Sequence, residues 1–86
     1  MSKIRVLLAD DQALLVAALS TILNAQEDIE VVTTAHTGNE AVTAAISHRI
    51  DVAILDIRMP GMDGIAAAQA ILSRAPDCRI KIGRAS

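Results

Sequence analysis

The stretch Val52-Ala53-Ile54-Leu55-Asp56-Ile57-Arg58-Met59-Pro60-Gly61-Met62-Asp63-Gly64 decides how the rest of this chain is interpreted. Residues 52–55 are apolar at every position, which is typical of a strand buried on both faces of a parallel sheet. The carboxylate of Asp56 follows at once, and a loop containing Pro60 and Gly61 comes after it. Ligands of open α/β sheets bind outside the carboxyl ends of the strands, so Asp56 is a candidate site residue.

A second apolar run, residues 4–9, also ends in acidic residues, Asp10 and Asp11. If the two runs are parallel neighbours, three carboxylates converge at one sheet edge, and they cannot all stay ionised without a counter-ion. Mg²⁺ prefers oxygen ligands, carboxylates among them, so the sequence predicts a magnesium site. The alternative is that Asp10, Asp11 and Asp63 are helix N-caps and Asp56 a solvated turn residue. That alternative explains any one of these residues taken alone. It explains less well why two apolar runs both end in acidic residues.

Strands and helices are expected to alternate along the whole chain. Strands are predicted at residues 3–9, 29–34, 51–55 and 78–82, and helices at 12–25, from 38 to about 48, and 64–74. The β-branched and partly polar run 29–34 suits an edge strand. This alternation is typical of an α/β fold with a parallel sheet.

Capping signals mark where the helices begin. Thr37 and Glu40 fit a capping box, and Asp63 is the expected N-cap of the third helix. Asp11 is a plausible N-cap of the first helix in addition to a metal ligand. Asn24 is expected to end that helix.

Two of the expected helices carry apolar positions at helical spacing. In the first helix these are Leu15, Ala18, Leu19 and Ile22, and the apolar surface is wide enough to need cover on more than one side. In the second helix, the residues expected to face inward are Ala41, Ala44, Ala45 and Ile46.

Length and composition limit the possible functions. Eighty-six residues allow one domain, and the absence of Phe, Tyr and Trp leaves a core of Leu, Ile, Val and Ala, as in part of a domain. The net charge of −2, without a basic block, gives no electrostatic attraction to nucleic acid. No apolar run is long enough to span a membrane, and Met1-Ser2-Lys3 leads into a strand without a secretory signal. We therefore expect a cytoplasmic protein.

Three further residues are candidate functional groups. The single Cys78 fits a reducing compartment and is predicted to be a structural thiol. His36 and His48 lack metal-ligand spacing and are predicted to lie on the surface. Because His36 follows the second strand, it is the one that could line the rim of the site.

The segment Leu8-Ala9-Asp10-Asp11-Gln12, taken with Leu55 to Gly64, resembles the receiver domain of two-component response regulators. The nearest subfamily is the one with a LuxR-type helix-turn-helix output domain. The resemblance extends from residue 3 to about residue 80. It implies a flavodoxin-like parallel sheet with strand order 2-1-3-4.

The resemblance also implies roles for the site residues. Asp56 corresponds to the phospho-acceptor, Asp11 to the direct Mg²⁺ ligand, and Asp10 to the acid that holds the metal through water. Arg58 corresponds to the position whose backbone carbonyl completes the metal shell. The implied partner is a sensor histidine kinase, and DNA would be contacted only by an output domain. The domain itself would not be an enzyme, beyond self-phosphorylation from small phosphodonors.

The chain departs from this family at its C-terminal end. A whole receiver domain has five strands and five helices, whereas this chain is a partial domain, native-like to about residue 80, with an atypical tail 81–86. The family's Ser or Thr after the fourth strand and Lys after the fifth have no counterpart, and neither Ser86 nor Lys81 is expected to replace them. We therefore expect weak or no phosphorylation. We also expect self-association through the fourth-strand edge, through the first-helix face, or by exchange of elements.

Two other functions are alternatives to a phosphorylated receiver domain. The first is an interaction or dimerisation module in which phosphorylation is vestigial. The second is a Mg²⁺ phosphohydrolase with an Asp-x-Asp motif, which is disfavoured because Arg58 stands where the second acid belongs.

Overall fold

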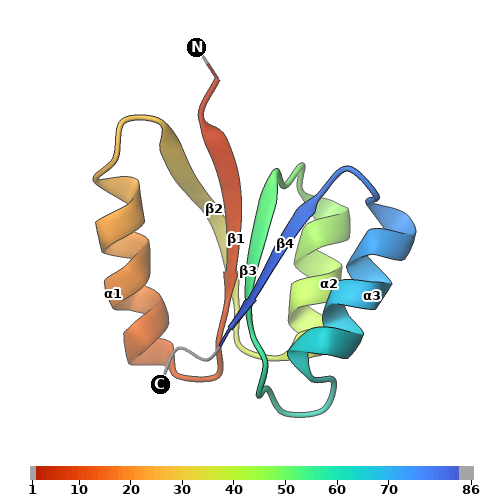
Figure 1. Cartoon of the computed structure of the whole chain (residues 1–86). Helices are drawn as coiled ribbons and strands as arrows, with labels where there is room; N and C mark the ends of the chain where they lie inside the picture. Colours follow the sequence, from red (N-terminus) through yellow and green to blue (C-terminus); the bar gives the residue numbers. More distant parts are fainter. Residues whose placement is uncertain (1, 84–86) are drawn as a thin grey trace.

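Four parallel strands form one sheet in the computed structural model of the protein, which describes residues 2–83 (Figure 1). The strands are β1 (Ile4–Ala9), β2 (Ile29–Ala35), β3 (Val52–Asp56) and β4 (Arg79–Gly83). Their order is β2-β1-β3-β4, which confirms the predicted order. Each boundary lies within one residue of its predicted position.

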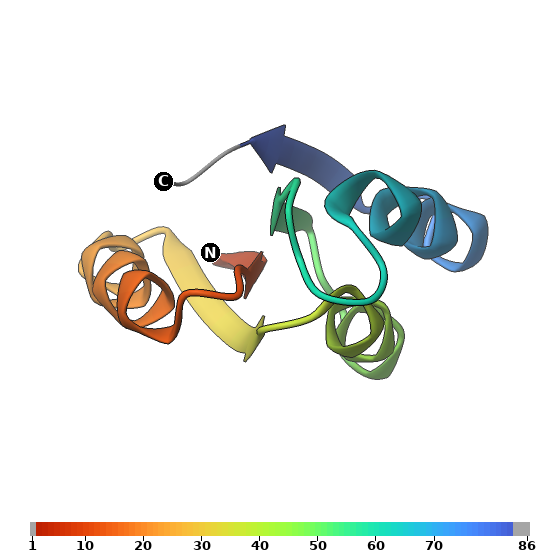
Figure 2. The same cartoon turned by 90° about the horizontal axis from the view of Figure 1, so that it is seen from below.

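Three helices cover the two faces of the sheet. They are α1 (Ala13–Asn24), α2 (Gly38–Ser47) and α3 (Gly64–Arg74). Helix α1 lies on one face, and α2 and α3 lie together on the other (Figure 2). The flavodoxin-like α/β architecture expected from the sequence is therefore confirmed. None of these helices, within residues 2–83, is both long enough and apolar enough to cross a lipid bilayer.

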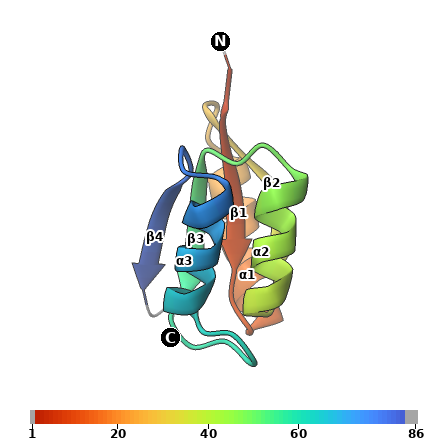
Figure 3. The ribbon, with the colours of Figure 1, turned by 90° about the vertical axis from the view of Figure 1, so that its right-hand side faces the viewer.

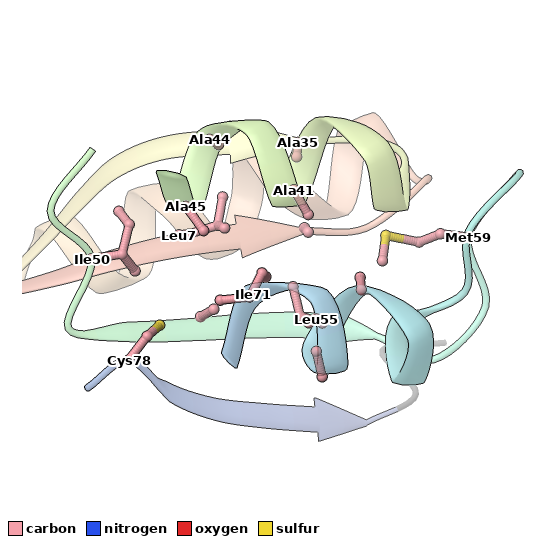
Figure 4. Packing of buried hydrophobic residues seen from close by; sticks show 14 residues of the cluster. Leu7, Ala35, Ala41, Ala44, Ala45, Ile50, Leu55, Met59, Ile71 and Cys78 are labelled. Atoms are coloured by element: carbon pink, nitrogen blue, oxygen red, sulfur yellow. The ribbon is translucent and has the colours of Figure 1, made fainter. Parts of the chain in front are cut away.

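The main core lies between the sheet and the pair α2–α3, and Figure 4 shows its side chains. Leu7 and Leu55 from the strands and Ile71 from α3 are its large, fully buried members. The buried residues that α2 contributes to it are all alanines, Ala41, Ala44 and Ala45, and the partly buried Val42 packs against them. Because alanine occupies little space and has the highest helix propensity, α2 can approach the sheet closely without an aromatic residue to fill the gap.

The helix caps follow the predictions with two corrections. Thr37 Oγ1 accepts a hydrogen bond from the Glu40 N–H (3.1 Å), and Asp63 Oδ1 accepts one from the Ala66 N–H (2.8 Å). The prediction that Asp11 caps α1 was wrong, because Gln12 occupies the N-cap position and has no side-chain bond there. The capping box is also open: the Glu40 carboxylate accepts from the N–H of His36 (3.3 Å) rather than from Thr37.

Helix α1 has the wide apolar surface expected from the sequence, and only part of that surface is covered. Val16 is the buried residue of this helix, whereas Leu15 and Leu19 are half-buried and Ala18 and Ile22 are exposed. Helix α1 packs against β2 and β1 along a narrow line, so its apolar surface is wider than its contact.

The prediction for Ile46 in α2 was wrong, since this side chain is exposed. It follows Ala45 by one residue, and that step of about 100° around the helix carries it past the face that contacts the sheet.

The sheet has two edges, β2 and β4. The partly polar strand β2 lies at an edge, which confirms the prediction. In β4 most residues are exposed, and Ile82 is among the exposed large apolar side chains of the described chain. The free edge of β4 offers N–H and C=O groups to another strand.

Replacing Ile71 by alanine tests the core. Ile71 is fully buried, so we expect Ile71→Ala to lower the free energy of unfolding by about 2–5 kcal/mol. Its neighbour Leu72 is 43% exposed and provides the matched control, for which Leu72→Ala should have a much smaller effect. Urea unfolding followed by far-ultraviolet circular dichroism measures both, because the chain has no aromatic reporter. Equal losses in the two variants would contradict the described packing.

Candidate metal centre

Parallel pairing of β1 with β3 brings three carboxylates together. Ala9 is in register with Leu55, so the residues that follow, Asp10 and Asp56, emerge side by side at the carboxyl edge of the sheet. Carboxylate oxygens of Asp10, Asp11 and Asp56 lie within 4.8 Å of one another. The structure thus brings together the three acidic residues that the sequence placed at one edge.

Two of these carboxylates are largely removed from water. Asp10 is 3% exposed and Asp56 is 8% exposed, whereas Asp11 is exposed. Burial raises the pKa of Asp10 above its ordinary value, and the nearby charges of Asp56 and Asp11 raise this pKa further. A hydrogen bond from the Gln12 N–H to Asp10 Oδ1 (2.9 Å) acts in the opposite direction.

No cationic side chain within residues 2–83 neutralises this cluster. The two ion pairs of the described chain join Arg5 to Glu30 and Arg49 to Asp51, away from the three carboxylates. Buried carboxylates without a cationic partner are the donor set that a hard divalent cation requires. The residues present therefore fit Mg²⁺, with Asp11 as the most accessible oxygen donor.

The loop that joins β3 to α3 is tied at both ends. The N–H of Ile57 donates to the Gly83 carbonyl (2.9 Å), and the N–H of Gly64 donates to the Ile57 carbonyl (3.1 Å). Met59 is buried and points from this loop into the core (Figure 4). Arg58, whose carbonyl is the predicted metal ligand, lies between the anchored residues Ile57 and Met59, and its side chain is exposed.

The sequence did not reveal that Met59 anchors this loop, because Ile57 and Met62 in the same loop are apolar too. Gly61, two residues after Met59, has a φ of +76°, a conformation that L side chains rarely adopt.

The histidines lie where the sequence predicted. Both are exposed. His36 lies at the rim of the acidic cluster, with Nδ1 3.2 Å from the Asp10 carbonyl oxygen. His48 lies at the far end of α2, with its ring bonded to the Ala44 carbonyl (3.1 Å).

The remaining candidates lie outside the cluster. Cys78 is buried, which raises the pKa of its thiol and fits a structural role. Lys81 is in β4, in register with Ile54 and two residues before Gly83, which pairs with Asp56. Ser86 lies outside the described residues.

An apolar hollow of about 190 Å³ adjoins the acidic cluster on the α1 face of the sheet. Leu8 and Ile54 from the sheet and Leu19 from α1 line it, and Asp10 and Asp56 border it. Helix α1 therefore leaves part of this face of the sheet uncovered.

Comparison with known proteins identifies the family. Residues 6–83 match the response regulator receiver domain. The chain is 54% identical over 74 residues to a protein-glutamate methylesterase/protein-glutamine glutaminase of Caldanaerobacter subterraneus. It is 46% identical over 79 residues to the oxygen regulatory protein NreC of Staphylococcus epidermidis. This chain belongs to the family of response regulator receiver domains of two-component signal transduction.

Solved structures agree with this assignment. The signal receiver domain of the response regulator NarL from Mycobacterium tuberculosis superposes with a TM-score of 0.92 and 35% identity, covering 100% of this chain and 69% of that one. The response regulator domain of Thermotoga maritima CheB gives a TM-score of 0.89 and 40% identity, covering 93% of this chain and 59% of that one. A LuxR-family regulator from Aurantimonas gives a TM-score of 0.88 at 26% identity, covering 94% of this chain and 58% of that one.

The chain corresponds to only part of these relatives. The aligned residues are 86% of this chain but 20% of the methylesterase, and 91% of this chain but 36% of NreC. What the relatives share with this chain is the receiver domain itself.

Substituting Asp10 tests the electrostatics of the cluster. The pKa of Asp10 is higher in the folded than in the unfolded chain, so the metal-free fold loses stability as the pH rises through the folded value. We expect Asp10→Asn, at neutral pH without metal, to raise the free energy of unfolding by about 0.5–2 kcal/mol, because it removes a buried charge that two neighbouring carboxylates repel. The substitution should also flatten the pH dependence above the unfolded pKa.

Urea titrations from pH 4 to 8 in EDTA measure this effect. Asp77→Asn, on an exposed residue remote from the cluster, is the control and should leave stability unchanged. A less stable Asp10→Asn protein would show that the buried carboxylate is not under electrostatic strain.

Proposed function

We propose that this chain is a phospho-accepting regulatory domain in which Asp56 receives a phosphoryl group from the phosphohistidine of a sensor kinase. The observation that supports this proposal is the cluster of three carboxylate side chains within 4.8 Å at the ends of β1 and β3. Asp56 combines burial with a position facing the hollow at the sheet edge. The domain accepts a group and is not an enzyme that turns over a substrate.

Mg²⁺ would be held by Asp11 directly, by Asp10 through water, by Asp56 and by the carbonyl of Arg58. When bound, the ion supplies positive charge that offsets the oxygens of the incoming phosphoryl group. A receiver-fold neighbour from Borrelia burgdorferi, CheY in its complex with CheX, BeF3 and Mg²⁺, supports this assignment (TM-score 0.86, 34% identity, 94% of this chain and 61% of that one).

Transfer of the phosphoryl group needs a carboxylate oxygen of Asp56 that is free to attack and a phosphorus atom held in line with it. An oxygen of Asp56 attacks the phosphorus as the P–N bond to the kinase histidine breaks, and the product is an acyl phosphate on Asp56. The protein contributes mainly positioning: β3 holds Asp56 at its end, and the loop anchored by Met59 limits where the phosphoryl oxygens can lie.

The relatives indicate what this domain would control. The LuxR-family regulator from Aurantimonas favours a DNA-binding output domain, and the methylesterase relative makes an enzymatic output the alternative. Nucleic acid would then be bound by the output domain and not by these residues. The phosphohistidine donor and the free buried thiol of Cys78 both fit a cytoplasmic location.

Incubation with acetyl phosphate, with and without Mg²⁺, tests the proposal by intact mass. We expect slow uptake of one phosphoryl group that requires Mg²⁺ and is absent in Asp56→Asn. Uptake should be slow because the chain has no counterpart of the family's phosphate-binding lysine. Lys81 does not replace it, since Lys81 is in register with Ile54 and therefore lies two residues short of Asp56 along the sheet.

Asp77→Asn is the matched control and should behave as the wild type. Uptake that persists in Asp56→Asn would contradict the assignment of the acceptor. Turnover of a generic phosphatase substrate would favour the phosphohydrolase alternative instead.

A second role, self-association, is favoured by exposed apolar surface. Leu14 on α1 is 85% exposed, and Ile82 on the free edge strand β4 is also exposed. We propose that the 86-residue chain pairs with a second copy through the first-helix face or the β4 edge. Burial of the apolar side chains on these surfaces is favourable, and the β4 edge has backbone groups that can pair with another strand.

Sedimentation velocity from 1 to 100 μM tests this role. We expect a concentration-dependent dimer. Leu14→Glu should weaken a dimer formed through α1, and Ile82→Lys should weaken one formed through the β4 edge. A folded monomer at every concentration would refute self-association.

A further inference from the structure

Residues 36–40 are the first turn of α2 and the two residues before it. They lie between the acidic turn that follows β1 and the loop that follows β3. Chain segment β2 ends at Ala35, beside β1, and α2 begins at Gly38. Figure 3 shows that α2 starts at the same end of the molecule as the loop that joins β3 to α3. This short segment therefore faces the acidic turn after β1 on one side and the loop after β3 on the other.

His36 makes the contact with the acidic turn. Its Nδ1 lies 3.2 Å from the Asp10 carbonyl oxygen, and in the tautomer with a proton on Nδ1 it donates a hydrogen bond there. Asp10 is also held by its own N–H, which donates to the Ala35 carbonyl (3.1 Å). The backbone of Asp10 is thus connected twice to the end of β2.

Gly38 makes the contact with the loop. A Cβ at this position would overlap the carbonyl oxygen of Met62 and lie 2.7 Å from the Met62 carbonyl carbon. The side chain of Asn39 lies near the same loop, since its Nδ2 is 3.7 Å from the place that a Cβ on Gly61 would take. The backbone of the loop therefore rests directly on the start of α2, and only glycine at position 38 permits that distance.

The segment is held in a fixed conformation by its own bonds. The hydrogen bonds from Glu40 N–H to Thr37 Oγ1 and from His36 N–H to the Glu40 carboxylate close it into one unit. Ala41 follows directly and is fully buried in the core. Because Ala41 fixes this unit to the core, the unit resists movement of the acidic turn or of the loop toward it.

We propose that residues 36–40 are a positioning element that sets the separation between the acidic turn and the Arg58 carbonyl, and thereby the preference of the site for Mg²⁺ over Ca²⁺. This proposal depends on the proposed function, because it assumes a metal at the acidic cluster. Mg²⁺ demands near-ideal octahedral geometry at short distances, whereas Ca²⁺ accepts longer and less regular coordination. A loop moved by a fraction of an ångström therefore affects Mg²⁺ more than Ca²⁺.

The variant Gly38→Ala tests the contact with the loop. Its methyl group forces the backbone at Met62 away, and we expect the Kd for Mg²⁺ to rise at least about tenfold, the scale found for residues that orient metal ligands. The Kd for Ca²⁺ should change much less. Isothermal titration calorimetry measures both constants without any phosphorylation, and amide chemical shifts of residues 57–63 report the displaced loop in the metal-free protein.

Thr43→Ala is the control for Gly38→Ala, because Thr43 is exposed on the same helix. It should leave both metal affinities and the loop shifts unchanged.

A pair of variants at His36 tests the contact with the acidic turn. His36→Ala removes the bond to the Asp10 carbonyl and should weaken Mg²⁺ binding more than Ca²⁺ binding. His36→Asn should restore it, because asparagine Nδ2 lies the same number of bonds from Cα as histidine Nδ1. A role in stability alone would not give this rescue or a change in the ratio of the two affinities.

The outcomes separate this proposal from the proposed function. A wild-type protein that does not bind Mg²⁺ would overturn both. A wild-type protein that binds Mg²⁺, with an unchanged ratio of Mg²⁺ to Ca²⁺ affinity in Gly38→Ala and His36→Ala, would overturn only the positioning role. If Gly38→Ala does not fold, the His36 variants decide, since they change one exposed side chain outside the core.

Discussion

The structure depends on the parallel pairing of β1 with β3, which forces acidic side chains together at one edge of the sheet. Asp10 and Asp56 are buried there beside Asp11, and no lysine or arginine of residues 2–83 is paired with them. Uncompensated charge of this kind destabilises a metal-free fold and is relieved when a divalent cation binds. The site therefore carries a repulsion that the remainder of the fold must withstand.

Close packing of the hydrophobic core offsets the repulsion between these carboxylates. Without aromatic residues, stability comes from close packing of Leu, Ile and Ala side chains between the sheet and the pair α2–α3. Met59 connects this core to the loop beside the site, and Gly38 brings the start of α2 against the same loop. The elements that stabilise the fold are thus also those that hold the metal-site loop in place.

The other face of the sheet is organised differently. Helix α1 buries Val16 against β1 and β2, and the hollow beside Ile54 and Leu19 opens next to Asp56. A partner that covered this hollow would also lie against the proposed phosphorylation site. The apolar surface and the chemistry of the site are therefore neighbours in space, although Leu19 and Asp56 are far apart in sequence.

The sequence by itself determined the features that depend on local chemistry: the strand positions, the caps Thr37 and Asp63, and the acidic residues that follow two apolar runs. Periodicity and capping act over a few residues, so they can be recognised without a structure. Only the tertiary structure decided which side of α1 is buried, why Ile46 faces solvent, and why Gln12 rather than Asp11 begins α1. It alone brought Gly38 against the loop after β3, whereas the position of His36 at the rim of the site was already expected because it follows the second strand. Those features depend on how elements distant in sequence pack together, and side-chain pattern along one helix does not specify the partner that will cover it.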